Sequence, residues 1–541
     1  MTEQQPPVDQ VDAVVIGAGF SGIYATYKLR DELGLSVLGF EAGTGVGGTW
    51  YWNRYPGARV DTLSQCYCFT FSRELIEGWT YSERYPPQPE ILAYLEYAAG
   101  KLDVPRSYRF QTRVEAMRWD DEAGVWHVRA SDGTTTRARY VVSAVGCLSV
   151  PLTPTIEGIE SFEGELYYTG HWPHEPVSFA GKRVGLIGTG ATGVQVVPVV
   201  AEEAAHLTVF QRTPSFTTPT RNRPLTPEEQ RINREESFQL LHDLKWTFGG
   251  NPLTALPRSV KDDPPEVRRA EFDRMFEAGD FSFWLANYND ILSDLEANEI
   301  AAEYLRDRIR QTVKDPVTAE KLCPRSYPYG TKRQPLDTGY FEAFNRDNVD
   351  LVDVNDDPIE AVVPEGVWLA SGVRELDVII MATGFDAMTG ALNNIRIEGR
   401  AGELLADRWH DGPRAYLGLA VAGFPNLFIV TGPGSPSVLT NMPYAIEQHV
   451  EWIADAIGHA EAHGIAVIEA TPEATTGWAD YVNEIAAGTL FPDTASWYMG
   501  ANIPGKPRVF MPYIGGLDQY RRECDEVAEK GYEGFRLVPA S

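Results

Sequence analysis

The chain of 541 residues has little cysteine and no long hydrophobic run. Its five cysteines, Cys66, Cys68, Cys147, Cys323 and Cys524, are sparse and odd in number, which is typical of reduced thiols and excludes a disulfide scaffold. No segment approaches the roughly 20 apolar residues of a membrane-spanning helix. The polar, acidic start has neither the basic residues nor the apolar centre of a signal peptide. We therefore expect a cytoplasmic protein whose cysteines serve in packing.

Basic residues are also scarce relative to acidic ones. The 47 Lys and Arg residues stand against 76 Asp and Glu, which gives a net charge of −29. Such a surface repels phosphate backbones and anionic lipids, so binding to nucleic acid or to a membrane is disfavoured. The hydrophobic fraction of 43% and the charged fraction of 23% are ordinary for a globular protein. At about 100–200 residues per domain, the length predicts several domains.

A glycine-rich turn follows the first β-branched run of the chain. Gly17, Gly19 and Gly22 have the spacing G-x-G-x-x-G between a predicted strand that ends at Ile16 and a predicted helix. The first glycine permits a tight turn, the second lets the backbone approach a pyrophosphate, and the third lets helix and strand pack closely. The next apolar run ends on Glu41, where an acid can bind ribose hydroxyls. This segment predicts a site for a dinucleotide that has a free ribose diol, such as FAD.

The same pattern recurs around Gly188, Gly190 and Gly193. Here the second strand is followed by Arg212 and Thr213 in place of an acid. An Arg removes the repulsion that an acid would cause and can bind a 2′-phosphate through two hydrogen bonds. The second site is therefore predicted to bind NADPH, and a plain surface charge at Arg212 is the alternative. Two dinucleotide sites in one chain indicate electron transfer between two cofactors.

The expected fold class is α/β, with two Rossmann-like dinucleotide-binding domains and a helical insertion. The insertion is predicted at 222–330, because this segment is charged, has helical stripes of apolar residues and contains few strand signals. The other parts follow the chain as FAD-binding domain, first part, 1–150; NADP-binding domain, first part, 151–221; NADP-binding domain, second part, 331–380; and FAD-binding domain, second part, 381–541.

Further motifs lie outside the two turns. They are the run from Gly47 to Arg59 with Asp61 after it, Lys332-Arg333, Ala382-Thr383-Gly384, and the run from Ser496 to Gly505. Together with the turns they resemble the type I Baeyer–Villiger monooxygenases, which are class B flavoprotein monooxygenases, from about residue 10 to about residue 535. Within that family, Gly432 to Ser437 is closer to the phenylacetone and steroid type than to the cyclohexanone type.

The resemblance implies a catalytic cycle with FAD, NADPH and O2. NADPH would reduce FAD, and the reduced FAD would capture O2 as a C4a-peroxide that attacks a ketone to give an ester or lactone. The peroxide must stay deprotonated, and the attacked carbonyl becomes an oxyanion, so a fixed cation is needed. Arg333 is expected to be that cation, because a guanidinium keeps its charge, and Asp61 is expected to orient it. A solvated loop charge at Arg333 and a turn-forming role for Asp61 are the alternatives.

The turns and the resemblance together assign a set of residues to the two cofactors. Cofactor binding is predicted for Gly17, Gly19, Phe20, Gly22, Glu41, Gly48, Thr49, Trp50, Trp52, Arg59, Asp61, Tyr67, Val114, Met442, Gly188, Gly190, Thr192, Gly193, Gln195, Arg212, Thr213, Lys332, Arg333 and Trp497. Lys332 is expected at the NADPH phosphate, and Trp497 on a mobile loop that closes over nicotinamide and substrate. For Met442 and Trp497 a packing role is the alternative. No metal ion and no obligate protein partner are expected.

One position departs from the family pattern F-x-G-x-x-x-H-x-x-x-W-P. The matching positions are Phe162, Gly164, Trp172 and Pro173. Tyr168 occupies the histidine position, and a phenol cannot become cationic as an imidazole can. His171, three residues later, either compensates in part or is incidental. The departure concerns coupling between domains and leaves the predicted chemistry unchanged.

Two rival functions share some of these features. A heteroatom (N- or S-) oxygenating flavin monooxygenase would use the same cofactor sites without the Asp61/Arg333 arrangement. A catalytically silent, NADPH-responsive flavoprotein sensor would bind flavin tightly and show no substrate-stimulated NADPH oxidation. A disulfide reductase is disfavoured, because Cys66 and Cys68 form C-x-C and the chain has no C-x-x-C. The family resemblance implies a ketone and O2 as substrates.

Overall fold

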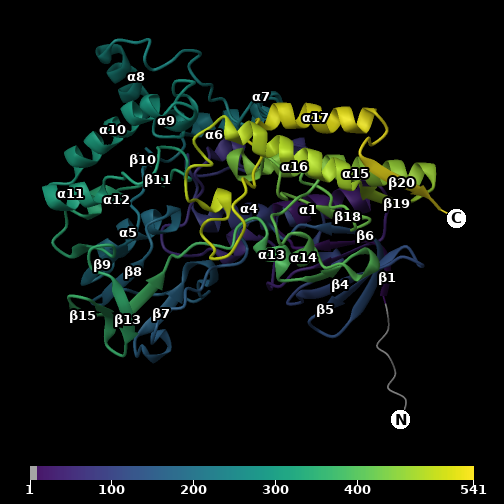
Figure 1. The fold of residues 1–541 in the computed structure, drawn as a ribbon, viewed down its shortest axis with the longest axis horizontal. Helices are drawn as coiled ribbons and strands as arrows, with labels where there is room; N and C mark the ends of the chain where they lie inside the picture. Colours follow the sequence, from purple (N-terminus) through teal and green to yellow (C-terminus); the bar gives the residue numbers. More distant parts are fainter. Residues whose placement is uncertain (1–8, 541) are drawn as a thin grey trace.

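The computed structural model describes residues 9–540. Figure 1 shows one sheet with β1, β4, β5 and β6 on the right and a second sheet with β7, β8 and β9 on the lower left. Helices from the middle of the chain lie at the upper left, and helices from its end lie along the upper right. Within the described residues, no helix has the length and hydropathy of a membrane span.

The elements follow the chain in the order of their labels. The strands are β1 Asp9–Ile16, β2 Val37–Phe40, β3 Tyr108–Arg109, β4 Val114–Asp120, β5 Val125–Ala130, β6 Thr135–Ser143, β7 Glu165–Tyr168, β8 Arg183–Ile187, β9 His206–Gln211, β10 Thr218–Pro219, β11 Leu336–Asp337, β12 Val349–Asp353, β13 Ile359–Val363, β14 Gly366–Leu369, β15 Gly372–Glu375, β16 Val378–Met381, β17 Arg396–Glu398, β18 Leu427–Ile429, β19 Ile465–Ala470 and β20 Phe535–Pro539.

The α-helices are α1 Phe20–Tyr27, α2 Thr49–Trp52, α3 Arg73–Glu77, α4 Gln88–Lys101, α5 Ala191–Glu203, α6 Pro227–Glu235, α7 Ser237–Leu244, α8 Pro265–Ala278, α9 Ser282–Leu285, α10 Leu295–Thr312, α11 Pro316–Leu322, α12 Tyr340–Ala343, α13 Gly390–Asn393, α14 Leu405–Arg408, α15 Met442–His463, α16 Pro472–Ala487 and α17 Leu517–Glu529. One π-helical turn, η1 Lys28–Glu32, continues α1. The 3₁₀ turns are η2 Ser64–Cys66, η3 Pro105–Ser107, η4 Ile159–Ser161, η5 Thr169–His171, η6 Arg400–Gly402, η7 Ser437–Leu439 and η8 Trp497–Met499.

The first sheet has the strand order β17-β4-β5-β6-β1-β2-β3, and β18 also pairs with β6. Strand β1 pairs in parallel with β2 and with β6, so β1, α1 and β2 form a β-α-β unit. The second sheet has the order β12-β9-β8-β16-β7, and all its pairs are parallel. In each sheet the first β-α-β unit contains a glycine-rich turn. The predicted α/β fold class with two Rossmann-like units is therefore confirmed.

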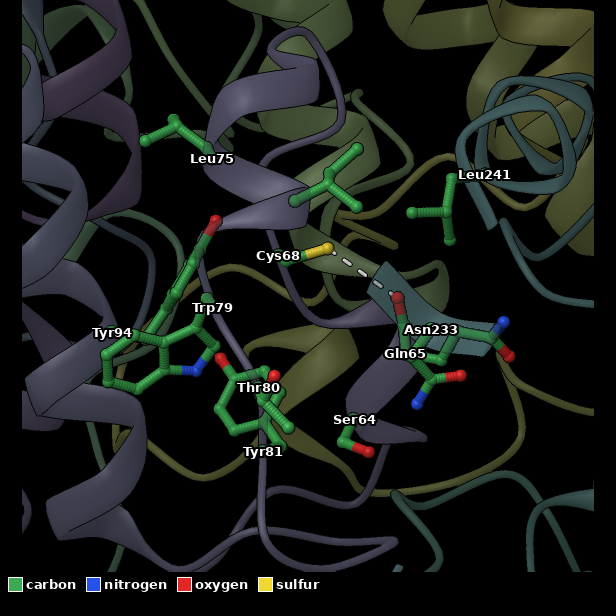
Figure 2. Close-up of a pocket in the computed structure, with 11 residues that line it drawn as sticks. Ser64, Gln65, Cys68, Leu75, Trp79, Thr80, Tyr81, Tyr94, Asn233 and Leu241 are labelled. Atoms are coloured by element: carbon green, nitrogen blue, oxygen red, sulfur yellow. Dashed lines mark hydrogen bonds between the residues drawn. The ribbon is translucent and has the colours of Figure 1, made fainter. Parts of the chain in front are cut away.

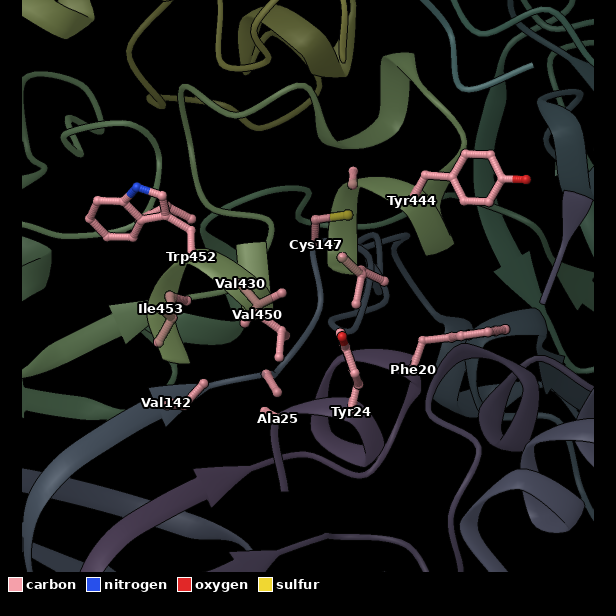
Figure 3. Packing of buried hydrophobic residues seen from close by; sticks show 14 of the residues in the cluster. Phe20, Tyr24, Ala25, Val142, Cys147, Val430, Tyr444, Val450, Trp452 and Ile453 are labelled. Carbon is pink, nitrogen blue, oxygen red and sulfur yellow. The ribbon is translucent and has the colours of Figure 1, made fainter. Parts of the chain in front are cut away.

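Helix α1 is fixed in place by the long helix α15, far away in the sequence. Figure 3 shows Phe20, Tyr24 and Ala25 of α1 in the same buried cluster as Val450 and Ile453 of α15. All five are at most 7% exposed. Since burial of a large apolar side chain contributes about 1.5–3 kcal/mol, this contact holds the start of α1, and with it the first turn, in one position.

The segment between β10 and β11 is helical and has an apolar cluster of its own. Phe272 of α8, Phe283 of α9 and Tyr304 of α10 pack together, with Phe283 stacked on Tyr304 at 5.3 Å between ring centroids. Helices α6 to α11 all lie within 222–330, where the helical insertion is predicted. The predicted domain boundaries themselves stay a prediction. Phe281 and Trp284 of this cluster lie at the site described below.

Candidate functional site

The first glycine-rich turn has no room for side chains. Gly17 has a φ of +102°, and a Cβ on it would lie 2.5 Å from the carbonyl oxygen of Ala144. A Cβ on Gly22 would lie 1.8 Å from the carbonyl oxygen of Gly17, and one on Gly19 would lie 3.3 Å from Cα of Gly48. The turn therefore leaves the N-terminal N–H groups of α1 bare, which is the arrangement that a pyrophosphate requires.

Glu41 connects the end of β2 to this turn. Its Oε2 accepts a hydrogen bond from the N–H of Ala18 at 2.8 Å, and its Oε1 accepts one from the N–H of Gly43 at 2.7 Å. Burial raises the pKa of Glu41 above its usual value, although these two N–H groups and Arg113 favour the ionised form. A carboxylate has about four acceptor positions, so two are left for ribose hydroxyls.

The second turn repeats this geometry. Gly188 has a φ of +113°, and a Cβ on it would lie 2.3 Å from the carbonyl oxygen of Ala382. A Cβ on Gly193 would lie 2.2 Å from the carbonyl oxygen of Gly188. No described atom comes within 4 Å of a Cβ on Gly190, so this turn is open at its middle glycine. Its surroundings therefore also fit a dinucleotide.

Two cations lie beside the second turn. Arg212 is exposed, and Lys332 is half-buried with its Nζ 4.7 Å from the centroid of the Tyr327 ring. The pKa of Lys332 is lowered by burial and by the charge of Arg212. Among residues 9–540 neither cation forms an ion pair with a carboxylate. An anion between them would remove their repulsion, so this donor set fits the 2′-phosphate of NADPH.

Residues near the second turn also connect it to the loop that follows α2. The hydroxyl of Tyr55 donates to Oε1 of Gln195 at 2.9 Å, and Nε2 of Gln195 donates to the carbonyl oxygen of Arg59 at 3.0 Å. Thr192 also lies at the Tyr55 hydroxyl. Gln195 and Thr192, predicted at the pyrophosphate, thus lie where the two nucleotide-binding units meet.

Arg333 and Asp61 form a close ion pair, although 272 residues separate them. Nη2 of Arg333 lies 2.6 Å from Oδ2 of Asp61, and Nη1 donates to the carbonyl oxygen of Val438 at 3.0 Å. The rings of Phe281 and Trp284 lie 5.0 and 5.8 Å from the guanidinium carbon. Burial works to lower the pKa of Arg333, but Asp61 and Tyr498 outweigh it and the pKa is raised. The guanidinium is therefore a permanent cation held on several sides.

The predicted aromatic residues of the flavin side also lie together. Nε1 of Trp50 donates to the hydroxyl of Tyr67 at 3.1 Å, and Phe20 meets the Tyr67 ring edge-on at 5.4 Å. Of the other predicted positions, Thr49 is exposed at the start of α2, and Val114 is buried in the core beside β5. Cofactor binding by Thr49 and Val114 stays a prediction.

Three more predicted residues are placed by their neighbours. The guanidinium of Arg59 is bound to Glu83 and to the carbonyl oxygen of Tyr85, both at 3.2 Å. Met442 is half-buried at the first position of α15, and Trp497 is half-buried with its ring 4.2 Å from that of Tyr498. Their contacts with a cofactor stay a prediction.

His171 contacts α2 of the other nucleotide-binding unit, whereas Tyr168 belongs to the second sheet. Tyr168 ends β7 and pairs with Met381 inside the second sheet. The His171 ring meets the ring of Trp52 edge-on at 5.8 Å between centroids. Its pKa is lowered by burial and by Arg113, both of which disfavour the charged form of the ring. His171 thus joins the two units by packing.

Two cavities lie next to each other and are both lined by Ser64 and Gln65. The smaller, shown in Figure 2 between η2 and helices α6 and α7, has about 30 Å³ and holds little more than a water molecule. The larger has about 250 Å³ and shares Ser64, Gln65 and Asn233 with it. Neither lining includes Arg333 or Asp61, so neither is assigned to the substrate.

Two dinucleotide-binding units in one chain define an oxidoreductase that uses two nucleotide cofactors. Residues 15–81 match the family model of an NAD(P)-binding Rossmann-like domain. The chain is 43% identical to a Baeyer–Villiger monooxygenase of Pseudooceanicola batsensis, over 96% of this chain and 95% of that protein. It is 42% identical to an acetone monooxygenase (methyl acetate-forming) of Gordonia sp., over 97% of this chain and 99% of that protein. The chain therefore belongs to the Baeyer–Villiger monooxygenase family, as the sequence motifs indicate.

Two other relatives concern the cofactors and the kind of atom that is oxygenated. The solved structure of OTEMO in complex with FAD and NADP superposes with a TM-score of 0.95 at 41% identity, and the match covers 98% of this chain and all of that one. A phenazine N-monooxygenase of Lysobacter antibioticus is 42% identical over 97% of both chains. Overall similarity alone thus does not separate carbonyl from nitrogen oxygenation.

Proposed function

We propose that this protein binds FAD at the first turn and NADPH at the second, and converts a ketone to an ester or lactone. Ketone, O2, NADPH and one proton give ester, NADP⁺ and water, which balances atoms and electrons. FAD held at the first turn and reduced by NADPH would supply the activation of O2. The resemblance to relatives whose names include ketones supports this proposal.

The Arg333–Asp61 pair is the observation that carries the proposal. Attack on a ketone places negative charge on the carbonyl oxygen, and a fixed donor aimed there lowers the barrier. Arg333 has the required properties, because Asp61, Val438 and two aromatic rings hold it while it stays charged. Asp61 orients the guanidinium and balances its charge.

The first experiment is aerobic incubation of the FAD-loaded protein with NADPH and a panel of ketones, with an amine and a sulfide as competitors. A ketone that gains one oxygen as ester or lactone, detected by mass spectrometry, is the expected result. Oxygenation of the amine or sulfide with no ketone product would instead establish the heteroatom function, which the phenazine N-monooxygenase relative favours. Flavin binding without either product would leave the catalytically silent flavoprotein sensor as the remaining function.

Arg333→Ala sharpens this test. Ester formation is expected to fall by about 10²–10³-fold, as for loss of an oxyanion donor, while NADPH still reduces the flavin. Arg258→Ala is the matched control, because Arg258 also pairs with a carboxylate, Asp263, and lies over a ring, Tyr288, but in the helical insertion. Normal ester formation by Arg333→Ala would overturn the role of Arg333.

A further inference from the structure

A tyrosine beside Arg333 has no role in the chemistry described so far. Tyr498 lies in η8, directly after Trp497, and its side chain is completely buried. Its hydroxyl makes no hydrogen bond of normal geometry to any residue in 9–540. Buried hydroxyl groups nearly always have a partner, so an orphaned hydroxyl beside the candidate site leaves a hydrogen-bond donor for a bound molecule.

The hydroxyl lies next to the guanidinium of Arg333. Burial raises the pKa of Tyr498 to about 12, while the charge of Arg333 works to lower it and that of Asp61 to raise it. In return, Tyr498 helps to raise the pKa of Arg333. A guanidinium has only donors, so the phenol oxygen can only accept from it. The phenol proton is then free for a third group.

The position of the Tyr498 ring is set by several contacts. Its ring lies against those of Trp497 and Phe491, at 4.2 and 5.6 Å between centroids. Its carbonyl oxygen accepts from the N–H of Met511 at 2.9 Å. A hydroxyl on such a held ring does not have to be ordered when a ligand binds, which is what preorganised catalysis requires.

The segment that follows is attached to the connection after β16. Nδ2 of Asn502 donates to the carbonyl oxygen of Phe385 at 2.8 Å, and Nζ of Lys506 lies 2.7 Å from Oδ1 of Asp386. Both bonds join residues about 120 positions apart in the chain. They hold the Trp497–Lys506 segment against this connection, with Tyr498 beside Arg333.

We propose that Tyr498 is a second hydrogen-bond donor for the ketone oxygen, with its hydroxyl accepting from Arg333 and donating to that oxygen. The inference rests on the proposed ketone oxygenation. Arg333 and Tyr498 share the negative charge that develops on the oxygen, and no proton is transferred. The phenol stays protonated over the working pH range, so the donor is always present.

Tyr498→Phe removes one oxygen atom and keeps the ring. Calorimetry on FAD-loaded protein with NADP⁺ measures binding of the panel ketone that binds most tightly. The dissociation constant of the Tyr498→Phe variant for this ketone is expected to be about 2- to 10-fold higher than that of the wild-type protein. Ester formation is expected to fall further, by about 10- to 100-fold, because the bond strengthens as charge develops. Flavin reduction by NADPH is expected to stay within about twofold, which a general loss of structure would not allow.

Tyr340→Phe is the matched control. Tyr340 is as buried as Tyr498 and also has a hydroxyl without a partner among the described residues, but it lies in α12 against α5. It is expected to change neither ketone affinity nor ester formation. Equal losses in both variants would show that any buried hydroxyl matters, and would overturn the assignment of Tyr498.

The remaining outcomes separate this inference from the proposed function. Wild-type ketone binding and ester yield in Tyr498→Phe would overturn the donor role and leave the proposed function intact. Ketone binding that depends on Tyr498, with no ester from the wild-type protein, would support the donor and overturn the function. A wild-type protein that binds no ketone would overturn both.

Discussion

The two glycine-rich turns have the same backbone and different side chains behind it. At Gly17 and Gly188 the chain takes a positive φ against a carbonyl oxygen, that of Ala144 directly after β6 or that of Ala382 directly after β16. After the second strand, however, the first unit has Glu41, buried and bonded to the turn. The shared geometry leaves room for a dinucleotide at each unit, and we infer that the residues after the second strand decide which dinucleotide fits.

The second unit replaces the acid by a different set of bonds. Gln211 is completely buried and donates through Nε2 to the carbonyl oxygen of Lys321 at 2.8 Å, away from the turn. The turn is closed instead by Thr189, whose Oγ1 donates to the carbonyl oxygen of Thr213 at 2.9 Å. Arg212 is thereby left exposed beside Lys332. One unit thus offers acceptors for a ribose diol, and the other offers cations for a phosphate.

The largest expected effect comes from filling the third glycine of each turn. Gly22→Ala should yield protein without flavin absorbance, whereas Gly193→Ala should keep its flavin and lose NADPH affinity by on the order of 100-fold, because the added methyl meets a backbone carbonyl. Flavin absorbance per protein and NADPH titration measure the two losses. Gly100→Ala in α4, with open space at its Cβ, is the neutral control. Loss of flavin in Gly193→Ala alone would reverse the cofactor assignment.

A smaller effect is expected from Arg212→Ala. Loss of one charge-assisted hydrogen bond should weaken NADPH by about 10- to 30-fold and leave NADH within about twofold, since NADH has no 2′-phosphate. Steady-state titration with both coenzymes measures the difference. An equal loss for both would place the phosphate elsewhere.

The smallest expected effect is a pH dependence. Lys332 is cationic below its pKa, which burial and Arg212 hold under the usual value for lysine. The preference for NADPH over NADH should therefore be full well below that pKa and fall a few-fold as the pH rises through it. Arg212→Ala should shift this fall to higher pH, because the repulsion is gone. An unchanged midpoint would show that the two cations do not act together.

Local features of the fold could be predicted from the sequence because they depend on neighbours in the chain. The strands beside Gly17 and Gly188, the helices after them and the acid at Glu41 follow from spacing and hydrophobic pattern. The Arg333–Asp61 contact could be expected only through family resemblance, since 272 residues separate the pair. Tyr498 lies within the Ser496 to Gly505 motif, but its residue type assigns it no role, because an aromatic residue beside Trp497 is expected to serve in packing.

The amino-acid sequence alone predicts two dinucleotide-binding units, their order along the chain, and an arginine in the second unit where the first has an acid. These are short-range properties, set by where glycine is required and which charge follows a strand. Three contacts follow only from the folded chain: His171 against Trp52, Gln195 between the two units, and Tyr498 buried at Arg333. Such contacts depend on how separate segments pack, and packing is a property of the whole chain that no local pattern encodes.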